Sequence, residues 1–357
     1  MSDWKEQRAH TIRARQDLPV SFSLHKNEEA FFTAEGQQDF HFGFAVTPYY
    51  FSLLSEAPDD PLRAQCIPRK DEFEIKEYEV QDPLWEESYS PLPRMVHRYP
   101  NRVLLLVTDE CALYCRHCFR RYFASRRSGV ISPEQLRKIV EYLQLHTEVQ
   151  EVVLSGGDPL VLGDARISEL LDILRYEVGR TLVLRLASRI PVVMPHRITP
   201  QLTKILSQHS PLFLITQFNH PREITPASRK AISGLVDAGV PVLNQAVLLK
   251  GVNDRAETLA ELFQGLLEMR VKPYYLFQGD LAAGTSHFRV PLAEGFDLMR
   301  KLRGQISGLA MPVYAVDLPE GGGKIPLTEN YIEKLQEGWY VFIGPDGKRY
   351  YYPEEAR

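Results

Sequence analysis

Apolar runs and amphipathic segments alternate through the middle of this sequence. The amphipathic segments have the 3.6-residue period of a helix and separate the apolar runs from one another. One of them, SPEQLRKIVEYLQLH at residues 132–146, opens with the typical helix cap Ser132, and Glu134 follows shortly after. Six or seven repeats of strand and helix predict an α/β fold in which parallel strands form a full or partial barrel. The apolar runs are NRVLLLVTDE, EVVLSGG, LVLRLAS, LFLITQF, PVLNQAVLL, PYYLFQ and PVYAVD.

The two ends of the chain lack this repeat. Residues 1–95 are rich in Pro, Glu and aromatic residues, and predict an N-terminal extension of short helices and linking segments. Residues 96–326 then form the core, which we expect to be a partial (βα)6-type barrel. Residues 327–357 predict a short β-rich tail, because GWYVFIGPDGKRYYYPEEAR alternates aromatic and polar residues about the turn from Gly344 to Gly347, a pattern typical of a β-hairpin.

Polar residues follow successive predicted strands. In βα barrels the catalytic groups gather where strands end and helices begin. A single polar loop is ordinary, because loops are exposed, but polar residues at seven ends in succession favour a functional site. The residues at these ends are the loop 111–118, Gly156 to Asp158, Arg185 with Ser188, Gln217 with Asn219 and His220, Gln245, Asp280 and Asp317.

Composition and charge exclude several functional classes. With 357 residues, of which 44% are hydrophobic, the chain can form a sizeable core. The net charge of −4 and the lack of a basic tail argue against nucleic-acid binding. No apolar run reaches about 18 residues, and the N-terminal stretch MSDWKEQRAH is too polar for a signal peptide. We therefore expect a cytoplasmic protein without membrane association.

Three of the four cysteines, Cys111, Cys115 and Cys118, lie within CALYCRHCFRR. A structural zinc site needs four ligands, but a second cysteine pair is missing and His117 between two cysteines has little reach. A redox dithiol at CRHC would need a thioredoxin-like strand pattern around it. An iron–sulfur cluster held by only three thiolates leaves one iron open to a substrate or cofactor. The CxxxCxxC spacing resembles the signature of the radical S-adenosylmethionine (SAM) superfamily, which implies a [4Fe-4S] cluster whose open iron binds SAM.

The stretch DLPEGGGKIP at residues 317–326 points to a second cofactor. Three glycines before Lys324 predict a backbone that closely approaches another group, or takes positive φ, beside an amine. A Walker A loop would need a different glycine spacing and a hydroxyl residue after the lysine, whereas a flexible turn with a solvated lysine stays a simple alternative. The lysine can also form a Schiff base with pyridoxal phosphate (PLP), whose phosphate Arg98, Tyr99 and Arg102 of HRYPNR could bind.

Taken in order, several segments resemble the lysine 2,3-aminomutase family of radical SAM enzymes. The similarity spans most of the chain and implies an isomerase that moves the α-amino group of L-lysine to the β-carbon. It implies a [4Fe-4S] cluster, SAM and PLP as cofactors, a small-molecule amino acid substrate, an electron donor such as flavodoxin or ferredoxin, and a homo-oligomer. The segments are AVTPYY, PLRAQCIP, YPNRVLLLVTDECALYCRHCFRR, SGGDPL, QFNHPREIT, NQAVLLKGVND, GDLAAGTSHFR and VDLPEGGGK.

The resemblance also implies roles for individual residues. The implied metal ligands are Cys111, Cys115 and Cys118. The implied SAM-binding residues are Gly156, Gly157, Asp158, Gln217 and His220, and those for PLP are Arg98, Tyr99, Arg102, Gln245 and the Schiff-base residue Lys324. The implied substrate-binding residues are Arg120 for the α-carboxylate and the pair Asp280 and Asp317 for the distal ammonium. Two acids beside one cavity are costly to desolvate without a cation, which supports the last assignment, although each can also be a solvated loop acid.

Three alternatives and two departures from the family pattern stay open. A guanidinium would also suit two carboxylates, so arginine 2,3-aminomutase is one alternative. A second is the family branch that converts a lysine used to modify elongation factor P, and a third is a nonenzymatic iron–sulfur binding module, in which Lys324 would be dispensable. PEGGGK places Glu320 where the usual form PGGGGK has glycine, and Arg255 stands where longer family members are expected to have a zinc-binding cysteine.

Overall fold

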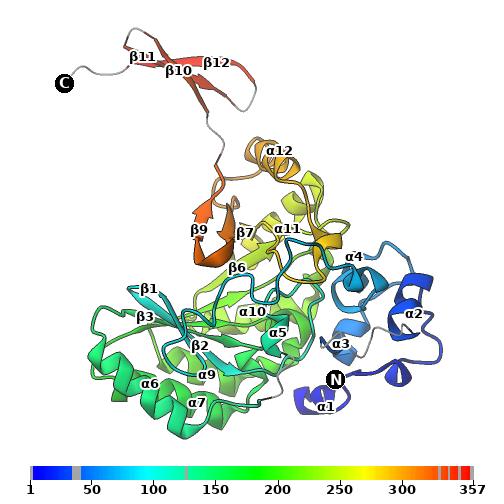
Figure 1. Ribbon diagram of the computed structural model, residues 1–357, viewed down its shortest axis with the longest axis vertical. Coiled ribbons are helices and arrows are strands. Elements are labelled where there is room, and N and C mark those ends of the chain that lie inside the picture. The colour runs from blue at the N-terminus through cyan, green and yellow to red at the C-terminus, as the bar shows by residue number, and fades with distance from the viewer. Residues whose placement is uncertain are drawn as a thin grey trace.

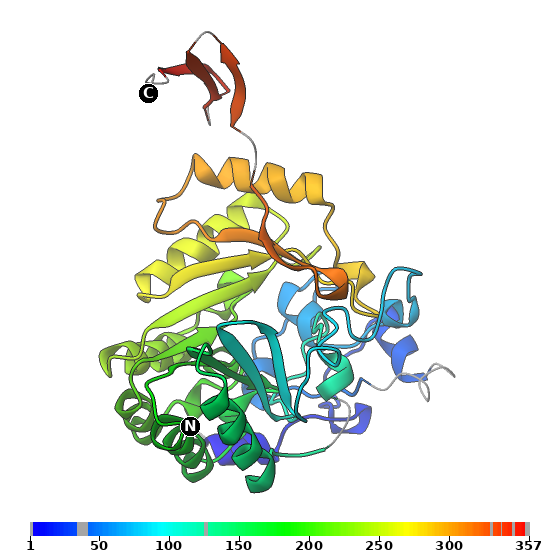
Figure 2. The same ribbon diagram turned by 60° about the vertical axis from the view of Figure 1, so that its left-hand side comes forward.

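The computed structural model describes residues 3–33, 42–124, 128–328, 331–336, 338–344 and 347–353. Its central feature is a curved sheet of nine strands in chain order, with helices against its outer side (Figures 1 and 2). Strands β2 to β8 are parallel, and β1 and β9 pair antiparallel at the two edges. The strands are β1 (Met95–Tyr99), β2 (Arg102–Thr108), β3 (Glu151–Gly156), β4 (Val183–Ala187), β5 (Leu212–Thr216), β6 (Val242–Val247), β7 (Lys272–Phe277), β8 (Val313–Leu318) and β9 (Gly323–Pro326).

Six helical connections join the seven parallel strands. Among the described residues, β1 and β9 do not pair with each other, so the sheet stays open. This confirms the predicted α/β fold as a partial (βα)6-type barrel, and each of the seven apolar runs overlaps one of the parallel strands. The connecting α-helices are α5 (Arg121–Ala124), α6 (Pro133–Leu145), α7 (Asp164–Asp172), α8 (Ile190–Val193), α9 (Pro200–Gln208), α10 (Pro226–Asp237), α11 (Ala256–Glu268) and α12 (Leu292–Arg303).

Helix α6 shows how the local sequence sets an element. The Ser132 hydroxyl oxygen accepts a hydrogen bond from the Gln135 backbone N–H at 3.1 Å, and the Gln135 side chain accepts one from the Ser132 N–H at 2.9 Å. The reciprocal capping partner is therefore Gln135, whereas Glu134 forms an exposed ion pair with Lys138. Burial of the helix's apolar stripe stabilises the fold by roughly 1.5–3 kcal/mol for each large side chain. The stripe consists of Leu136, Ile139, Val140 and Leu143.

The two faces of the sheet differ because side chains alternate along each strand. In β3, Val152 and Leu154 are buried in the core, while Val153 and Ser155 line a cavity on the opposite face. Strand β4 repeats the pattern, with Arg185 on the cavity face. The cavity therefore lies inside the curve of the sheet, and the helices cover the other side (Figure 2).

The N-terminal extension consists of short helices along one side of the barrel (Figure 1). Buried acids tie it to the core. Glu72 binds Arg116 at 2.6 Å and Arg121 at 3.1 Å, and Glu79 binds Arg289 at 3.2 Å. The predicted boundaries near residues 95 and 326 stay predictions. The α-helices of the extension are α1 (Trp4–Ala9), α2 (Lys26–Thr33), α3 (Pro48–Phe51) and α4 (Pro61–Cys66).

The C-terminal tail forms a separate three-stranded sheet that stands away from the barrel (Figures 1 and 2). Its strands are β10 (Ile332–Gln336), β11 (Trp339–Ile343) and β12 (Arg349–Pro353). The antiparallel pairing of β11 with β12 confirms the predicted hairpin, while turn positions 345 and 346 lie outside the described residues. Strand β10 was not predicted.

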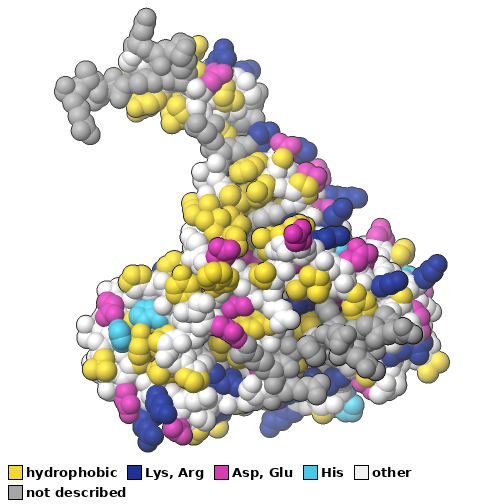
Figure 3. Space-filling model, in the orientation of Figure 1, with side chains coloured by type: hydrophobic (Ala, Val, Ile, Leu, Met, Phe, Trp, Pro, Cys, Tyr) yellow, Lys and Arg dark blue, Asp and Glu magenta, His cyan; other side chains and the backbone are white. Residues whose placement is uncertain are grey.

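Two further observations concern the surface and the helices. Acidic and basic side chains are interspersed on the face drawn in Figure 3. Within the described ranges, none of the helices combines the length and apolar character that a bilayer crossing requires.

Candidate active site

A cavity of about 610 Å³ lies on the inner side of the sheet. Its wall brings together segments from β1 to β9, so the cysteine loop and Lys324 share one space. His220 does not line this cavity: it caps the short helix η7 (Pro221–Glu223), where its ring Nδ1 accepts the Arg222 backbone N–H at 3.1 Å. The predicted site residues that do line it are Arg98, Tyr99, Arg102, Cys111, Cys115, Cys118, Arg120, Gly156, Gly157, Asp158, Gln217, Gln245, Asp280, Asp317 and Lys324.

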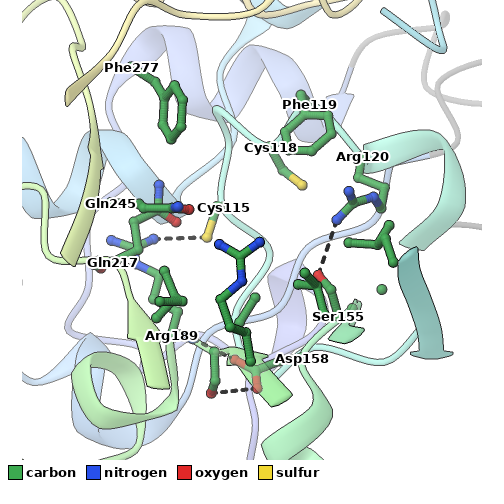
Figure 4. A pocket seen from close by; sticks show the side chains of 18 of the residues that line it. Cys115, Cys118, Phe119, Arg120, Ser155, Asp158, Arg189, Gln217, Gln245 and Phe277 are labelled. Atoms are coloured by element: carbon green, nitrogen blue, oxygen red, sulfur yellow. Dashed lines mark hydrogen bonds between the residues drawn. The ribbon is translucent and has the colours of Figure 1, made fainter. Parts of the chain in front are cut away.

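A buried arginine lies against the cysteine loop. Arg189 Nη1 donates a hydrogen bond to the Cys115 sulfur at 2.8 Å (Figure 4). Its Nη2 donates to Glu223 Oε1 at 2.7 Å. Burial lowers the pKa of Arg189, but Cys115 and Glu223 together raise it above its ordinary value. The cavity therefore holds a fixed cation beside one of the three predicted cluster ligands.

The other two thiols, Cys111 and Cys118, are partly buried in the cavity wall. Burial raises the pKa of Cys111 well above its ordinary value and that of Cys118 to about 11. A metal binds thiolates, so it would have to displace these protons. Among the described residues, no three His, Cys, Asp or Glu side chains converge on a single metal-ion position. A cubane cluster does not require this, because each thiolate binds a different iron.

Two glycines allow the end of β3 to pack closely against the segment that leads into the cysteine loop. Gly156 has a φ of +114°, and a Cβ atom there would lie 2.3 Å from the Thr108 carbonyl oxygen. A Cβ atom on Gly157 would lie 2.2 Å from the Glu110 carbonyl oxygen. Contacts this short exclude any side chain, so the SGGD sequence is needed for the shape of this cavity wall.

The Asp158 carboxylate is fully used within the protein. Its Oδ1 accepts hydrogen bonds from Ser188 Oγ at 2.7 Å and the Leu160 N–H at 3.0 Å, and its Oδ2 accepts the Arg189 backbone N–H at 2.8 Å (Figure 4). Burial raises the pKa of Asp158 to about 6. This residue therefore supports the loop that carries Arg189, and its predicted part in SAM binding stays a prediction.

Lys324 reaches the cavity from β9. Its backbone N–H donates to the Tyr99 hydroxyl at 3.0 Å, and its Nζ lies 3.6 Å from Asp317 Oδ2 and 4.2 Å from the centre of the Phe277 ring. Burial lowers the pKa of Lys324, although Asp317 opposes this effect. An amine that loses its proton more easily is a better nucleophile toward an aldehyde.

Two acids lie near this amine. Burial and then the negative charge of Asp317 raise the pKa of Asp280 to about 7, while Lys324 and Arg120 lower it. The carboxylate pair is costly to ionise fully in a buried site, and a second cation beside it would remove that cost. The cavity is therefore suited to a ligand with a positively charged end.

Arg120 carries the opposite charge on the same cavity wall. Its Nε and Nη2 donate to the two oxygens of Glu86 at 2.7 and 2.5 Å. Its Nη1 donates to Ser155 Oγ at 3.2 Å (Figure 4). Burial lowers the pKa of Arg120, but Glu86 raises it above its ordinary value, so the guanidinium keeps its charge. The cavity thus combines a fixed cation with an acidic pair.

Comparison with known proteins agrees with this geometry. A family model for the radical SAM superfamily matches residues 105–200, and a model named Lysine-2,3-aminomutase matches residues 299–354. The L-lysine 2,3-aminomutase of Acetoanaerobium sticklandii is 43% identical over 334 residues, which cover 93% of this chain and 79% of that protein. This chain belongs to the lysine 2,3-aminomutase family.

Two further relatives show the range of the lysine 2,3-aminomutase family. The L-lysine 2,3-aminomutase of Clostridium subterminale is 42% identical over 332 residues, which cover 93% of this chain and 79% of that protein. The glutamate 2,3-aminomutase of Clostridioides difficile is 39% identical over 348 residues, which cover 97% of this chain and 81% of that protein. Overall identity is thus similar for relatives with cationic and anionic substrates, so the cavity residues must decide the substrate.

Membership in the lysine 2,3-aminomutase family implies a [4Fe-4S] cluster, SAM and PLP, and this chain fits them. The three thiols and the SGGD turn line one part of the cavity wall. Arg98 Nη2 is buried without a hydrogen-bond partner among the described residues, and a Cβ atom on Gly323 would lie 3.8 Å from it. A buried donor of this kind needs an acceptor, which a phosphate oxygen would provide beside Lys324.

One departure from the lysine 2,3-aminomutase pattern has a local structural effect. Glu320 stands where the usual form has glycine, and its φ is +56°, in the left-handed region that favours glycine. The strain is confined to the short helix η9 (Pro319–Gly321), and Lys324 on the following strand still lines the cavity.

Two residues of this site, Arg189 and Glu86, were not predicted from the sequence. Arg189 directly follows Ser188, a predicted strand-end residue, so the rule that catalytic groups follow strands could have found it. Glu86 lies in the N-terminal extension, outside the repeat, and one acid in an acid-rich stretch gives no local signal.

Proposed function

We propose that this protein is an L-lysine 2,3-aminomutase, a radical SAM isomerase that moves the α-amino group of L-lysine to the β-carbon and yields L-β-lysine. The observation that carries this proposal is the placement of Asp280 and Asp317 beside Lys324, in a cavity that also contains Arg120. An amino acid with a distal ammonium complements both charges. The acidic pair would bind the ammonium, and Arg120 would bind the α-carboxylate.

The bound cofactors would supply a carbon-centred radical, generated from SAM at the cluster, and a PLP ring that carries the migrating nitrogen. The protein's own residues hold and orient these groups. Cys111, Cys115 and Cys118 would hold the cluster, while Lys324, with its lowered pKa, would provide the amine that anchors PLP. By fixing both ends of the substrate, the protein would hold the β-carbon in position to react with the radical. This positioning is its main contribution to the rate.

The charge of the cavity separates the candidate substrates. A glutamate side chain would place a third carboxylate beside Asp280 and Asp317, whereas lysine or arginine would balance the pair. Lysine is favoured over arginine as the substrate because the two relatives with 43% and 42% identity are named L-lysine 2,3-aminomutases. The family branch that acts on the lysine used to modify elongation factor P differs in substrate. The anaerobic amino acid assay described below distinguishes this branch from the proposed enzyme.

The partners of the reaction follow from its chemistry. Reduction of the cluster needs one electron at a time, so we infer a small donor such as flavodoxin or ferredoxin. Assembly into a homo-oligomer stays a prediction.

An anaerobic assay with a panel of amino acids tests the proposal. Reconstituted protein is reduced and incubated with SAM, PLP and L-lysine, L-arginine, L-ornithine or L-glutamate, and β-amino acids are separated by chromatography. We expect β-lysine as the main product, and no product from glutamate. Asp317→Asn should reduce lysine turnover strongly. Preferred conversion of arginine or glutamate would overturn the substrate assignment, and a protein that binds no PLP would support the iron–sulfur binding module instead.

A further inference from the structure

The N-terminal extension contributes a charged residue to the cavity wall. Glu86 is only 7% exposed and lines the cavity together with Leu84. Its two carboxylate oxygens accept hydrogen bonds from Arg120 Nε and Nη2, and Oε2 also accepts one from the Tyr122 hydroxyl at 3.1 Å. A buried carboxylate with this many charge-assisted contacts is held in one orientation.

The geometry leaves one edge of Arg120 for a second carboxylate. A guanidinium has five N–H groups. Glu86 takes Nε–H and one N–H of Nη2, and Ser155 takes one N–H of Nη1 at 3.2 Å. Among the described residues no other side chain or carbonyl accepts from Arg120, so one N–H group on each Nη atom is left for a carboxylate. Glu86 therefore fixes the plane in which Arg120 presents this edge.

The segment around Glu86 is itself anchored next to the acidic end of the cavity. Val80 pairs with Ala282 through an isolated parallel bridge, and Glu79 binds Arg289, whose Nη2 donates to the Asp280 carbonyl oxygen at 2.9 Å. One short stretch of the extension thus contacts both Arg120 and the loop that carries Asp280. It sets the separation between the two ends of the substrate site.

We propose that Glu86 is a positioning residue that orients Arg120 toward the α-carboxylate of the substrate and so makes the enzyme select a free carboxylate. The proposal rests on the proposed lysine aminomutase function. Glutamine at position 86 would have one acceptor oxygen and would turn an N–H₂ group toward the guanidinium. The variant would therefore lose one of the two hydrogen bonds between residue 86 and Arg120. The guanidinium plane of Arg120 would then no longer be held in one orientation.

The test compares two ligands that differ only in the carboxylate. L-Lysine and L-lysinamide are titrated into PLP-loaded protein without SAM or reductant, and binding is followed by calorimetry; KM and kcat for lysine are measured separately. Glu86→Gln is compared with Glu86→Asp and with the control Glu77→Gln, which removes an exposed acid from the same segment. Thermal unfolding and iron content report whether each variant is folded.

We expect Glu86→Gln to weaken lysine binding and raise KM about tenfold, with a smaller change in kcat and no change in the affinity for lysinamide. Glu86→Asp should show a smaller change in the same direction, and it carries the test if the glutamine variant fails to fold. Glu77→Gln should match the wild type. The inference is overturned if lysine affinity stays within twofold, or if lysine and lysinamide are weakened equally. A wild-type protein that neither binds nor converts lysine would instead disprove the proposed function.

Discussion

Replacement of Asp280 by asparagine should stabilise the protein and weaken lysine binding at the same time. The pKa of Asp280 is raised from an ordinary 3.8 to about 7, first by burial and then by the negative charge of Asp317. Because the pKa is higher in the folded state, the stability that Asp280 contributes is fully present below pH 3.8 and is lost as the pH rises through about 7. Without a ligand, its ionised carboxylate is therefore unfavourable.

The size of both effects follows from these values. The difference between 3.8 and about 7 corresponds to at most about 4 kcal/mol in the free energy of unfolding. Asparagine removes this cost, so Asp280→Asn should unfold at a higher denaturant concentration than the wild type, and the gain should be larger at pH 8 than at pH 6. A hydrogen bond to a charged group contributes about 1.5–3 kcal/mol, so lysine affinity should fall about 10- to 100-fold.

The assay measures denaturant unfolding and lysine affinity at pH 6 and pH 8. Asp59→Asn, which removes an exposed acid outside the cavity, is the matched control. In the wild type, lysine should bind more tightly at pH 8, because Asp280 is then ionised, and Asp280→Asn should lose most of this pH dependence. The reasoning is refuted if the variant binds lysine within twofold of the wild type at pH 8, or if it is less stable than the wild type there.

Three other substitutions test single features of the site. Lys324→Ala should abolish the visible absorbance of bound PLP and retain the iron; an unchanged spectrum would rule out Lys324 as the PLP anchor. Glu320→Gly should raise the free energy of unfolding by about 0.5–1 kcal/mol, since it relieves a left-handed residue, and a loss of stability in denaturant would contradict this. Arg189→Met should lower the free energy of unfolding by about 3–5 kcal/mol, because Glu223 stays buried without its cation. A loss below about 1 kcal/mol would show that the Arg189–Glu223 ion pair is not needed for stability.

The parallel strands could be predicted because each one is a short apolar run bounded by polar strand ends. One face of each strand is buried in the core and the other faces the barrel interior, which produces this pattern directly. Strand β10 was missed because its segment gives no comparable run. The Ser132 cap was predicted, and its reciprocal partner is Gln135.

Most of the cavity wall could be predicted because barrel chemistry gathers at strand ends, where Asp280 and Asp317 stand. Lys324 lies on the antiparallel edge strand β9 and was indicated instead by the three glycines before it. His220 also follows a strand, yet its ring turns to cap η7, since side-chain direction is set by local hydrogen bonds that the sequence does not display. Glu86 joins the site through tertiary packing of the N-terminal extension, and no local pattern records such a contact.

In the proposed reaction, nitrogen moves between adjacent carbons of lysine. Its most direct test uses L-lysine with carbon-13 at the β-position, incubated anaerobically with the reduced, cofactor-loaded protein and followed by NMR. We expect the labelled signal to move to that of an amine-bearing carbon, and Lys324→Ala to give no such signal. A labelled carbon that stays unchanged, although cluster, SAM and PLP are all bound, would contradict the account.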